Sequence, residues 1–358
     1  MNLPNGIHGA TFKVLGIGLL ALLMFIPLAQ VRELVSERAS REEAAKAAIA
    51  SRWGDEQMLG GPVLVIPVHY RVEQDKGWRT VEVREFVLPD RLNVSGTLEP
   101  EIRQYGIYET PVYVARLHLE GDFLPKDIAA LGCTGCEPQW DQAQLRVPIS
   151  DVRGLREISP IRFNGTDVRL GPDDGGVAGI AAVSAAVIVE QGASTPLAFA
   201  FDMTLAGTAR IAMLPLARQT QAKLGANWPD PGFDGAFLPV SRTVNDKGFE
   251  AQWQVLDVNR RIPQHWREND GNSNINPAAA SFGVSLVQVT NPYQRNERAG
   301  KYGVLFIGLT FVAFFLFEVL RCLRVHPVQY LLVGLALCTF YVVLLALSEQ
   351  VGFGFAYL

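Results

Sequence analysis

Long apolar runs lie near the two ends of this 358-residue chain, and the centre has none of similar length. Residues 14–31 carry no charge over about 18 positions, which at a 1.5 Å rise crosses most of a ~30 Å hydrocarbon core. Residues 302–320 and 328–347 are each near the length that one crossing needs. The pattern predicts three transmembrane helices. The first is an uncleaved anchor, because the apolar region of a signal peptide is usually shorter and precedes a small-residue cleavage site.

The segment between the last two apolar runs predicts the orientation of the chain. Residues 321–327 include Arg321 and Arg324 and no acid. A short loop of this kind stays in the cytoplasm by the positive-inside rule. We therefore expect residues 1–13 in the cytoplasm and residues 32–300 outside it. Residues 348–358 read as the start of a truncated fourth membrane segment, since their apolar part is too short to cross.

The region after the first span changes from a helical to a strand-like pattern. Residues 32–53 are rich in strong helix formers and precede Gly54, which predicts a helical stalk. Residues 54–300 then form a β-rich domain of short β-branched and aromatic runs separated by turn residues. Eight strands are expected, at 63–70, 80–88, 112–119, 145–149, 182–189, 197–205, 249–255 and 282–289.

The strand pattern favours a β-sandwich. No helical periods lie between the strands, which argues against a βαβ fold. The sandwich is either one double-sized unit or two tandem halves, with the Gly-rich segment 171–180 as the junction.

Charge and motifs exclude several classes of protein. The formal net charge of −4 lacks the basic excess typical of nucleic-acid binding. No HExxH pair for zinc, no G-x-S-x-G nucleophile turn and no phosphate-binding glycine loop is present. We therefore predict no metal, no cofactor and no catalytic residue.

Cys133 and Cys136 form a single CxxC pair in a segment expected to meet an oxidising compartment. A zinc ribbon needs a second pair, and a thioredoxin-like site needs a βαβ environment. The favoured interpretation is a local disulfide, with metal binding and redox activity as alternatives.

The densest motif is the loop 224–239, which contains two prolines, several glycines and the aromatic residues Trp228, Phe233 and Phe237. Such a rigid aromatic loop can stack on sugars or anchor a partner, so these three residues are candidate binding residues. The alternative is that the rings plug the edge of the sandwich, because aromatic side chains are more often part of a core.

Several motifs recur in order in one known family. They are Gly106-Ile107-Tyr108, Gly121-Asp122-Phe123, Ser150-Asp151-Val152-Arg153-Gly154, Phe163-Asn164-Gly165-Thr166, Asn227-Trp228-Pro229-Asp230-Pro231, Phe237-Leu238-Pro239, and the membrane run from Arg298-Ala299 through His326-Pro327-Val328-Gln329-Tyr330-Leu331-Leu332-Val333-Gly334-Leu335 to Leu347-Ser348-Glu349. On these motifs, almost the whole chain resembles the CreD family of bacterial inner-membrane proteins, also called cell envelope integrity proteins. The two cysteines lie outside them.

The resemblance implies a multi-pass inner (plasma) membrane protein of a Gram-negative bacterium, with its large domain in the periplasm. It also implies a link to a two-component stress response, colicin tolerance and β-lactam response, and further membrane helices beyond residue 358. It implies no catalytic residues.

The expected function is non-enzymatic support of envelope integrity. The lipid bilayer is one partner, and the periplasmic domain binds an envelope glycan, lipid or protein. One alternative is a glycan-active enzyme with two carboxylates at glycosidase spacing. Another is a transporter, for which Glu318 would have to face an interior cavity.

Overall fold

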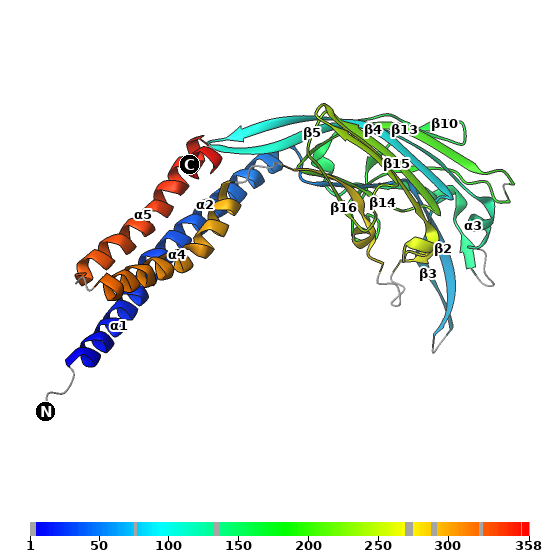
Figure 1. The fold of residues 1–358 in the computed structure, drawn as a ribbon. Coiled ribbons are helices and arrows are strands. Elements are labelled where there is room, and N and C mark those ends of the chain that lie inside the picture. Colours follow the sequence, from blue (N-terminus) through cyan, green and yellow to red (C-terminus); the bar gives the residue numbers. More distant parts are fainter. Residues whose placement is uncertain are drawn as a thin grey trace. The chain divides into compact units, whose positions relative to one another are not determined.

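The computed structural model divides the chain into two compact units, one of Met1–Ala45 with Gln288–Leu358 and one of Lys46–Val287. Figure 1 shows the helices of the first unit and the curved sheets of the second. The residues that the structure describes are 5–74, 77–131, 136–192, 194–268, 275–287, 292–321, 325–351 and 353–357.

The helical unit contains three helices that are long and apolar enough to cross a membrane. Its elements are α1 (Asn5–Leu23), α2 (Phe25–Trp53) as far as Ala45, α4 (Pro292–Arg321), α5 (Pro327–Val351) and α6 (Phe353–Tyr357). The helix is interrupted at Met24, between α1 and α2. Pro27 explains the interruption, because it has no N–H to donate and its ring clashes with the carbonyl of the residue four positions earlier.

The helices of this unit pack through a small buried cluster of Met24, Ile307, Phe311, Tyr330 and Cys338. Tyr330 of α5 meets the ring of Phe311 of α4 edge-on, with centroids 5.5 Å apart. Gly334 of α5 lies against Met24 and Phe311, and a small residue at such a contact lets membrane helices approach closely.

The β-rich unit contains three sheets. The nine-stranded sheet has the order β10 (Thr166–Val168), β9 (Ile161–Phe163), β13 (Leu197–Thr208), β5 (Tyr108–Phe123), β4 (Arg91–Tyr105), β15 (Gln219–Ala226), β18 (Gly248–Leu256) and β17 (Ser241–Asn245), with β8 (Leu155–Ile158) also paired to β13.

The seven-stranded sheet has the order β11 (Gly171–Pro172), β12 (Ala182–Ala186), β7 (Gln144–Pro148), β2 (Val63–Gln74), β3 (Gly77–Val87) and β19 (His265–Arg267), with β6 (Cys136–Pro138) also paired to β2. The four-stranded sheet has the order β1 (Gln57–Gly60), β14 (Arg210–Leu214), β20 (Phe282–Leu286) and β16 (Pro231–Gly235). A short helix, α3 (Pro125–Ala129), follows β5.

The main core lies between the nine-stranded sheet and the other two, since one buried cluster draws side chains from all three. The seven-stranded sheet is buried on both faces at the start of β2. Leu64 and Ile66 of β2 face the main core. Val63 and Val65 face a second cluster with Trp266. Alternate residues of a strand point to opposite faces, so β2 reads as a nearly continuous apolar run.

The predicted fold class, a β-rich domain with membrane helices, is confirmed. All eight predicted strands fall on observed strands. Strands from both sides of residues 171–180 are neighbours in one sheet, as β5 and β13 are. The Gly-rich segment itself contains β11, which pairs with β12. These pairings favour one double-sized unit over two tandem halves.

Candidate functional site

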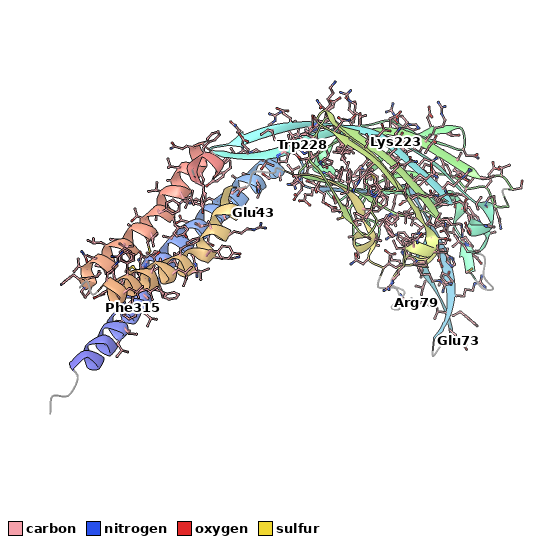
Figure 2. The ribbon with its side chains drawn as sticks, viewed as in Figure 1. Glu43, Glu73, Arg79, Lys223, Trp228 and Phe315 are labelled. Carbon is pink, nitrogen blue, oxygen red and sulfur yellow. The ribbon has the colours of Figure 1, made fainter. Side chains whose placement is uncertain are left out.

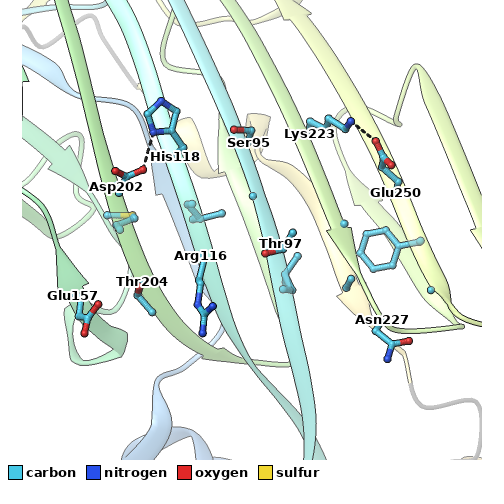
Figure 3. Close-up of a pocket in the computed structure, with 18 of the residues that line it drawn as sticks. Ser95, Thr97, Arg116, His118, Glu157, Asp202, Thr204, Lys223, Asn227 and Glu250 are labelled. Carbon is cyan, nitrogen blue, oxygen red and sulfur yellow. Dashed lines mark hydrogen bonds and ion pairs between the residues drawn. The ribbon is translucent and has the colours of Figure 1, made fainter.

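An open groove of about 1300 Å³ crosses the outer face of the nine-stranded sheet. Its lining comes from seven strands, which follow one another in the order β8, β13, β5, β4, β15, β18 and β17. Figure 3 shows polar side chains from β8, β13, β5, β4, β15 and β18 in this groove. Lys223, one of them, is also labelled in Figure 2.

The first row of polar side chains follows from strand register. Asp202 of β13 pairs with His118 of β5, and His118 pairs in turn with Ser95 of β4. Ser95 is the register partner of Lys223 on β15. Directly paired residues point to the same face, so the four side chains form a line across the strands.

The second row lies two residues further along each strand. It contains Glu157, Thr204, Arg116, Thr97, Gly225, Glu250 and Thr243, each the register partner of the next. Gly225, the fifth of the seven, has no side chain, so the row is lowest at that position. The two rows together give the groove its hydroxyl, amide and charged lining.

The charged side chains of the groove are mostly paired with each other. His118 Nδ1 lies 2.7 Å from Asp202 Oδ1. Lys223 forms an ion pair with Glu250. Arg116 lies 3.3 Å from Glu99, which is just outside the lining. The groove therefore presents donors and acceptors side by side with little net charge.

The first row contains Ser95, His118 and Asp202, which are the three residue types of a serine hydrolase triad. A working triad needs a hydrogen bond between the serine and the imidazole. None joins Ser95 to His118 among the described contacts, and His118 Nε2 lies 3.8 Å from Glu120 Oε2 instead. In this geometry the imidazole of His118 contacts carboxylates rather than the Ser95 hydroxyl.

No cluster of three or more His, Cys, Asp or Glu side chains suited to a metal occurs in the described part of the chain.

The aromatic residues predicted from the loop 224–239 are half-buried and pack against the main core. Phe233 meets Phe249 and Trp253 edge-on, at 5.7 and 5.9 Å between ring centroids. Phe237 meets Phe282 at 6.2 Å. The Trp228 indole N–H donates to the Asp230 carbonyl at 3.2 Å. These contacts match the interpretation as a plug at the sandwich edge, and a binding role for the rings stays a prediction.

The other predicted sites lie partly outside the described residues. Cys136 is half-buried at the start of β6. Cys133 lies outside the described residues, and the predicted disulfide therefore lies outside them too. Arg321 is the last residue of α4, whereas Arg324 is also outside. Glu318 is buried in the helical unit, where the Tyr330 hydroxyl lies 3.5 Å from its carboxylate.

Sequence reasoning named no groove residue as a site residue, although the predicted loop 224–239 includes Gly225, Ala226 and Asn227 of the lining. A further signal was present. In β4, buried Leu92, Val94 and Leu98 alternate with exposed side chains such as Ser95 and Thr97. That alternation is typical of a strand with one solvated face. The alternation is hard to recognise in the sequence because Gly96 and many polar residues interrupt it.

Comparison with known proteins agrees with this architecture. The family model described as "Inner membrane protein CreD" matches residues 9–358. The chain is also 34% identical over 344 residues to the inner membrane protein CreD of Escherichia coli (strain K12), covering 94% of this chain and 75% of that protein. The resemblance seen in the sequence motifs is thereby confirmed, and the chain belongs to the CreD family of inner membrane proteins.

Proposed function

We propose that this membrane protein holds its β-rich domain in the periplasm and supports envelope integrity by binding an envelope component in the groove. The observation that carries the proposal is the groove itself. It joins two rows of polar side chains over seven neighbouring strands. An open concavity of this size suits a large ligand better than a small metabolite, which usually occupies a more closed pocket.

The membrane helices support the proposed location. α4 ends at Arg321, and α5 begins at Pro327, so the connection is short. With Arg321 and Arg324 and no acid, that connection fits the cytoplasmic side. The β-rich domain, which precedes α4, is then on the opposite side of the membrane.

Filling the groove tests the proposal. Thr97 is exposed near the centre of the groove, and Thr97→Trp places a bulky ring there at a position where strands accept aromatic residues. In cells whose own copy is deleted, we expect this variant to lose protection against envelope stress at normal abundance. Thr80→Trp, at an exposed position of β3, is the matched control and should protect fully. Full protection by Thr97→Trp at normal abundance contradicts the proposal.

The aromatic loop is a second candidate contact surface, because Asn227, the residue before Trp228, lines the groove. Trp228→Ala is the variant to use, since Phe233 and Phe237 also meet aromatic rings of the core and their loss would destabilise the domain more. Reduced protection with an unchanged unfolding temperature would support this contact. Full protection would remove Trp228 from the binding surface.

A further inference from the structure

We propose that the groove takes an unbranched, uncharged glycan, lying across the strands with its sugar hydroxyl and amide groups on the two polar rows. This inference rests on the proposed function and adds the chemical class of the ligand.

The shape of the groove fits a linear polymer. Its lining spans seven consecutive strands. Neighbouring strands are about 4.8 Å apart, so the groove extends for about 30 Å across the sheet. A pyranose ring in an extended chain advances by a distance close to one strand spacing. Successive sugars would therefore meet successive strands in similar surroundings.

Unengaged polar side chains supply the hydrogen bonds. Ser95, Thr97, Thr204, Thr243 and Asn227 line the groove, and their hydroxyl or amide groups form no hydrogen bond within the described protein. A hydroxyl group both donates and accepts, as does a side-chain amide. This set matches a ligand that carries many hydroxyl and acetamido groups.

The paired charges match vicinal hydroxyls. In the pair of His118 with Asp202, the two side chains meet at 2.7 Å, and Lys223 and Glu250 are likewise in direct contact. Each pair presents a donor next to an acceptor. Two neighbouring sugar hydroxyls can engage such a pair, each using one donor and one acceptor function. Hydrogen bonds to charged groups are also the stronger kind.

The overall charge of the groove argues against an anionic polymer. The cationic side chains Arg116, Lys223 and Lys247 are balanced by three acidic ones, Glu157, Asp202 and Glu250. A polyanion would need a cationic excess, and its binding would weaken strongly with salt.

The groove also lacks what an extended peptide would use for specificity. The apolar side chains in the lining belong to the core beneath the sheet, with Leu117 and Met203 both 3% exposed. Side chains as buried as these two offer little surface to the side chains of a peptide. Small side chains and Gly225 in the floor instead leave room for the flat edge of a sugar ring.

The test uses the full chain in lipid nanodiscs with chitohexaose, a neutral hexamer of β-1,4-linked N-acetylglucosamine, as the probe in titration calorimetry. We expect saturable binding that changes little with salt. Chitobiose should bind with an affinity at least about tenfold lower, because a disaccharide contacts only part of the groove lining. Thr97→Trp should abolish binding of the hexamer, and Thr80→Trp should leave it unchanged.

A second variant pair tests the chemistry without filling the groove. Lys223→Met removes one donor of the charged pairs, and we expect it to weaken chitohexaose binding about fivefold, the loss of roughly one hydrogen bond. Lys126→Met, on α3 outside the groove lining, is the matched control and should bind as the unchanged chain does.

Three outcomes overturn the inference. One is equal hexamer binding by Thr97→Trp and the unchanged chain. Another is tighter groove-dependent binding of an alternating glutamate–lysine peptide than of the hexamer. The third is no hexamer binding at all; if Thr97→Trp still fails to protect cells, the glycan class is wrong while the proposed function stands.

Discussion

Arg146 and Asp173 form an ion pair inside the β-rich domain, with side chains only 4% and 3% exposed. The Arg146 Nε lies 3.1 Å from the Asp173 carboxylate. The other carboxylate oxygen accepts the backbone N–H of Gly176 at 2.6 Å. Burial lowers the pKa of Arg146, and the facing Asp173 opposes that shift. The pair thus fastens the Gly-rich segment onto β7.

Asp173→Asn should lower the free energy of unfolding by about 3–5 kcal/mol, because it leaves the buried Arg146 charge uncompensated. Asp167→Asn is the control, since Asp167 and its partner Arg162 are 63% and 72% exposed. That change should cost less than about 1 kcal/mol. Denaturant unfolding followed by tryptophan fluorescence measures both. Equal losses in the two variants would show that burial of the first pair is unimportant.

We predict that the β-rich domain loses stability at alkaline pH as Tyr70 loses its proton. Burial, followed by the hydrogen bond from its hydroxyl to Glu85, raises the pKa of Tyr70 to about 12. In the unfolded chain the tyrosine pKa is about 10. The folded state therefore holds the proton more tightly, so this stabilisation is complete below pH 10 and is lost as the pH rises towards 12.

Tyr70→Phe should flatten the fall of the unfolding free energy between these pH values. The measurement is the difference between the two chains in denaturant unfolding at each pH. At neutral pH the variant should be less stable by about 1 kcal/mol, the usual value of one hydrogen bond. Parallel pH curves for the two chains would contradict the assignment.

At the scale of elements, Gly334 of α5 controls the packing of the membrane helices. A Cβ added there would lie 2.7 Å from Met24 Sδ and 3.1 Å from the Phe311 ring. Met24 is flexible and can adjust to one methyl group, but not to a branched side chain. Gly334→Leu should destabilise the helical unit by about 1–3 kcal/mol, the usual cost of overpacking.

Gly308→Leu, also within a span, is the matched control because nothing lies within 4 Å of a Cβ at that position. The readout is the temperature at which Cys338, buried in the helical unit, becomes reactive to a maleimide, located by mass spectrometry. Gly334→Leu should lower this temperature, and Gly308→Leu should leave it unchanged. Equal behaviour would mean that Gly334 is not a packing contact.

Strands with strong apolar alternation or long β-branched runs could be predicted from the sequence, including β5, β13 and β18 of the groove, whereas β4, β8, β15 and β17 could not. β2 and β5 carry enough valine, leucine and isoleucine to stand out. β15 is built from QTQAKLGA, whose buried face is only threonine, alanine and leucine. Its place in the sheet depends on pairing with β4 and β18, which no local pattern reveals. The rows of the groove exist only once that register is known.

The aromatic loop shows the opposite case. Trp228, Phe233 and Phe237 were prominent in the sequence, yet two of the rings are held by aromatic contacts to the core. Composition alone does not distinguish a ring that binds a ligand from one that fills an edge. Only the partners of each ring do so.

At the scale of the whole molecule, the proposed topology can be tested in intact spheroplasts. A cysteine introduced by Thr80→Cys should react with a membrane-impermeant maleimide added from outside. Arg321→Cys should react only after the membrane is permeabilised, because the connection after α4 is expected in the cytoplasm. Mass spectrometry assigns each adduct to its position, so the native cysteines do not interfere. The reverse pattern would invert the topology.

The parallel pairing of β4 with β15 has a consequence for how the protein is made. Ser95 and Lys223 are register partners although more than a hundred residues separate them. The β4–β5 hairpin is therefore complete long before its neighbour has been synthesised, and the edge of β4 is open during that time. Such an edge invites wrong pairing and slows folding. A chain that lacks β15 has no groove, so errors in biogenesis should appear first as loss of the groove.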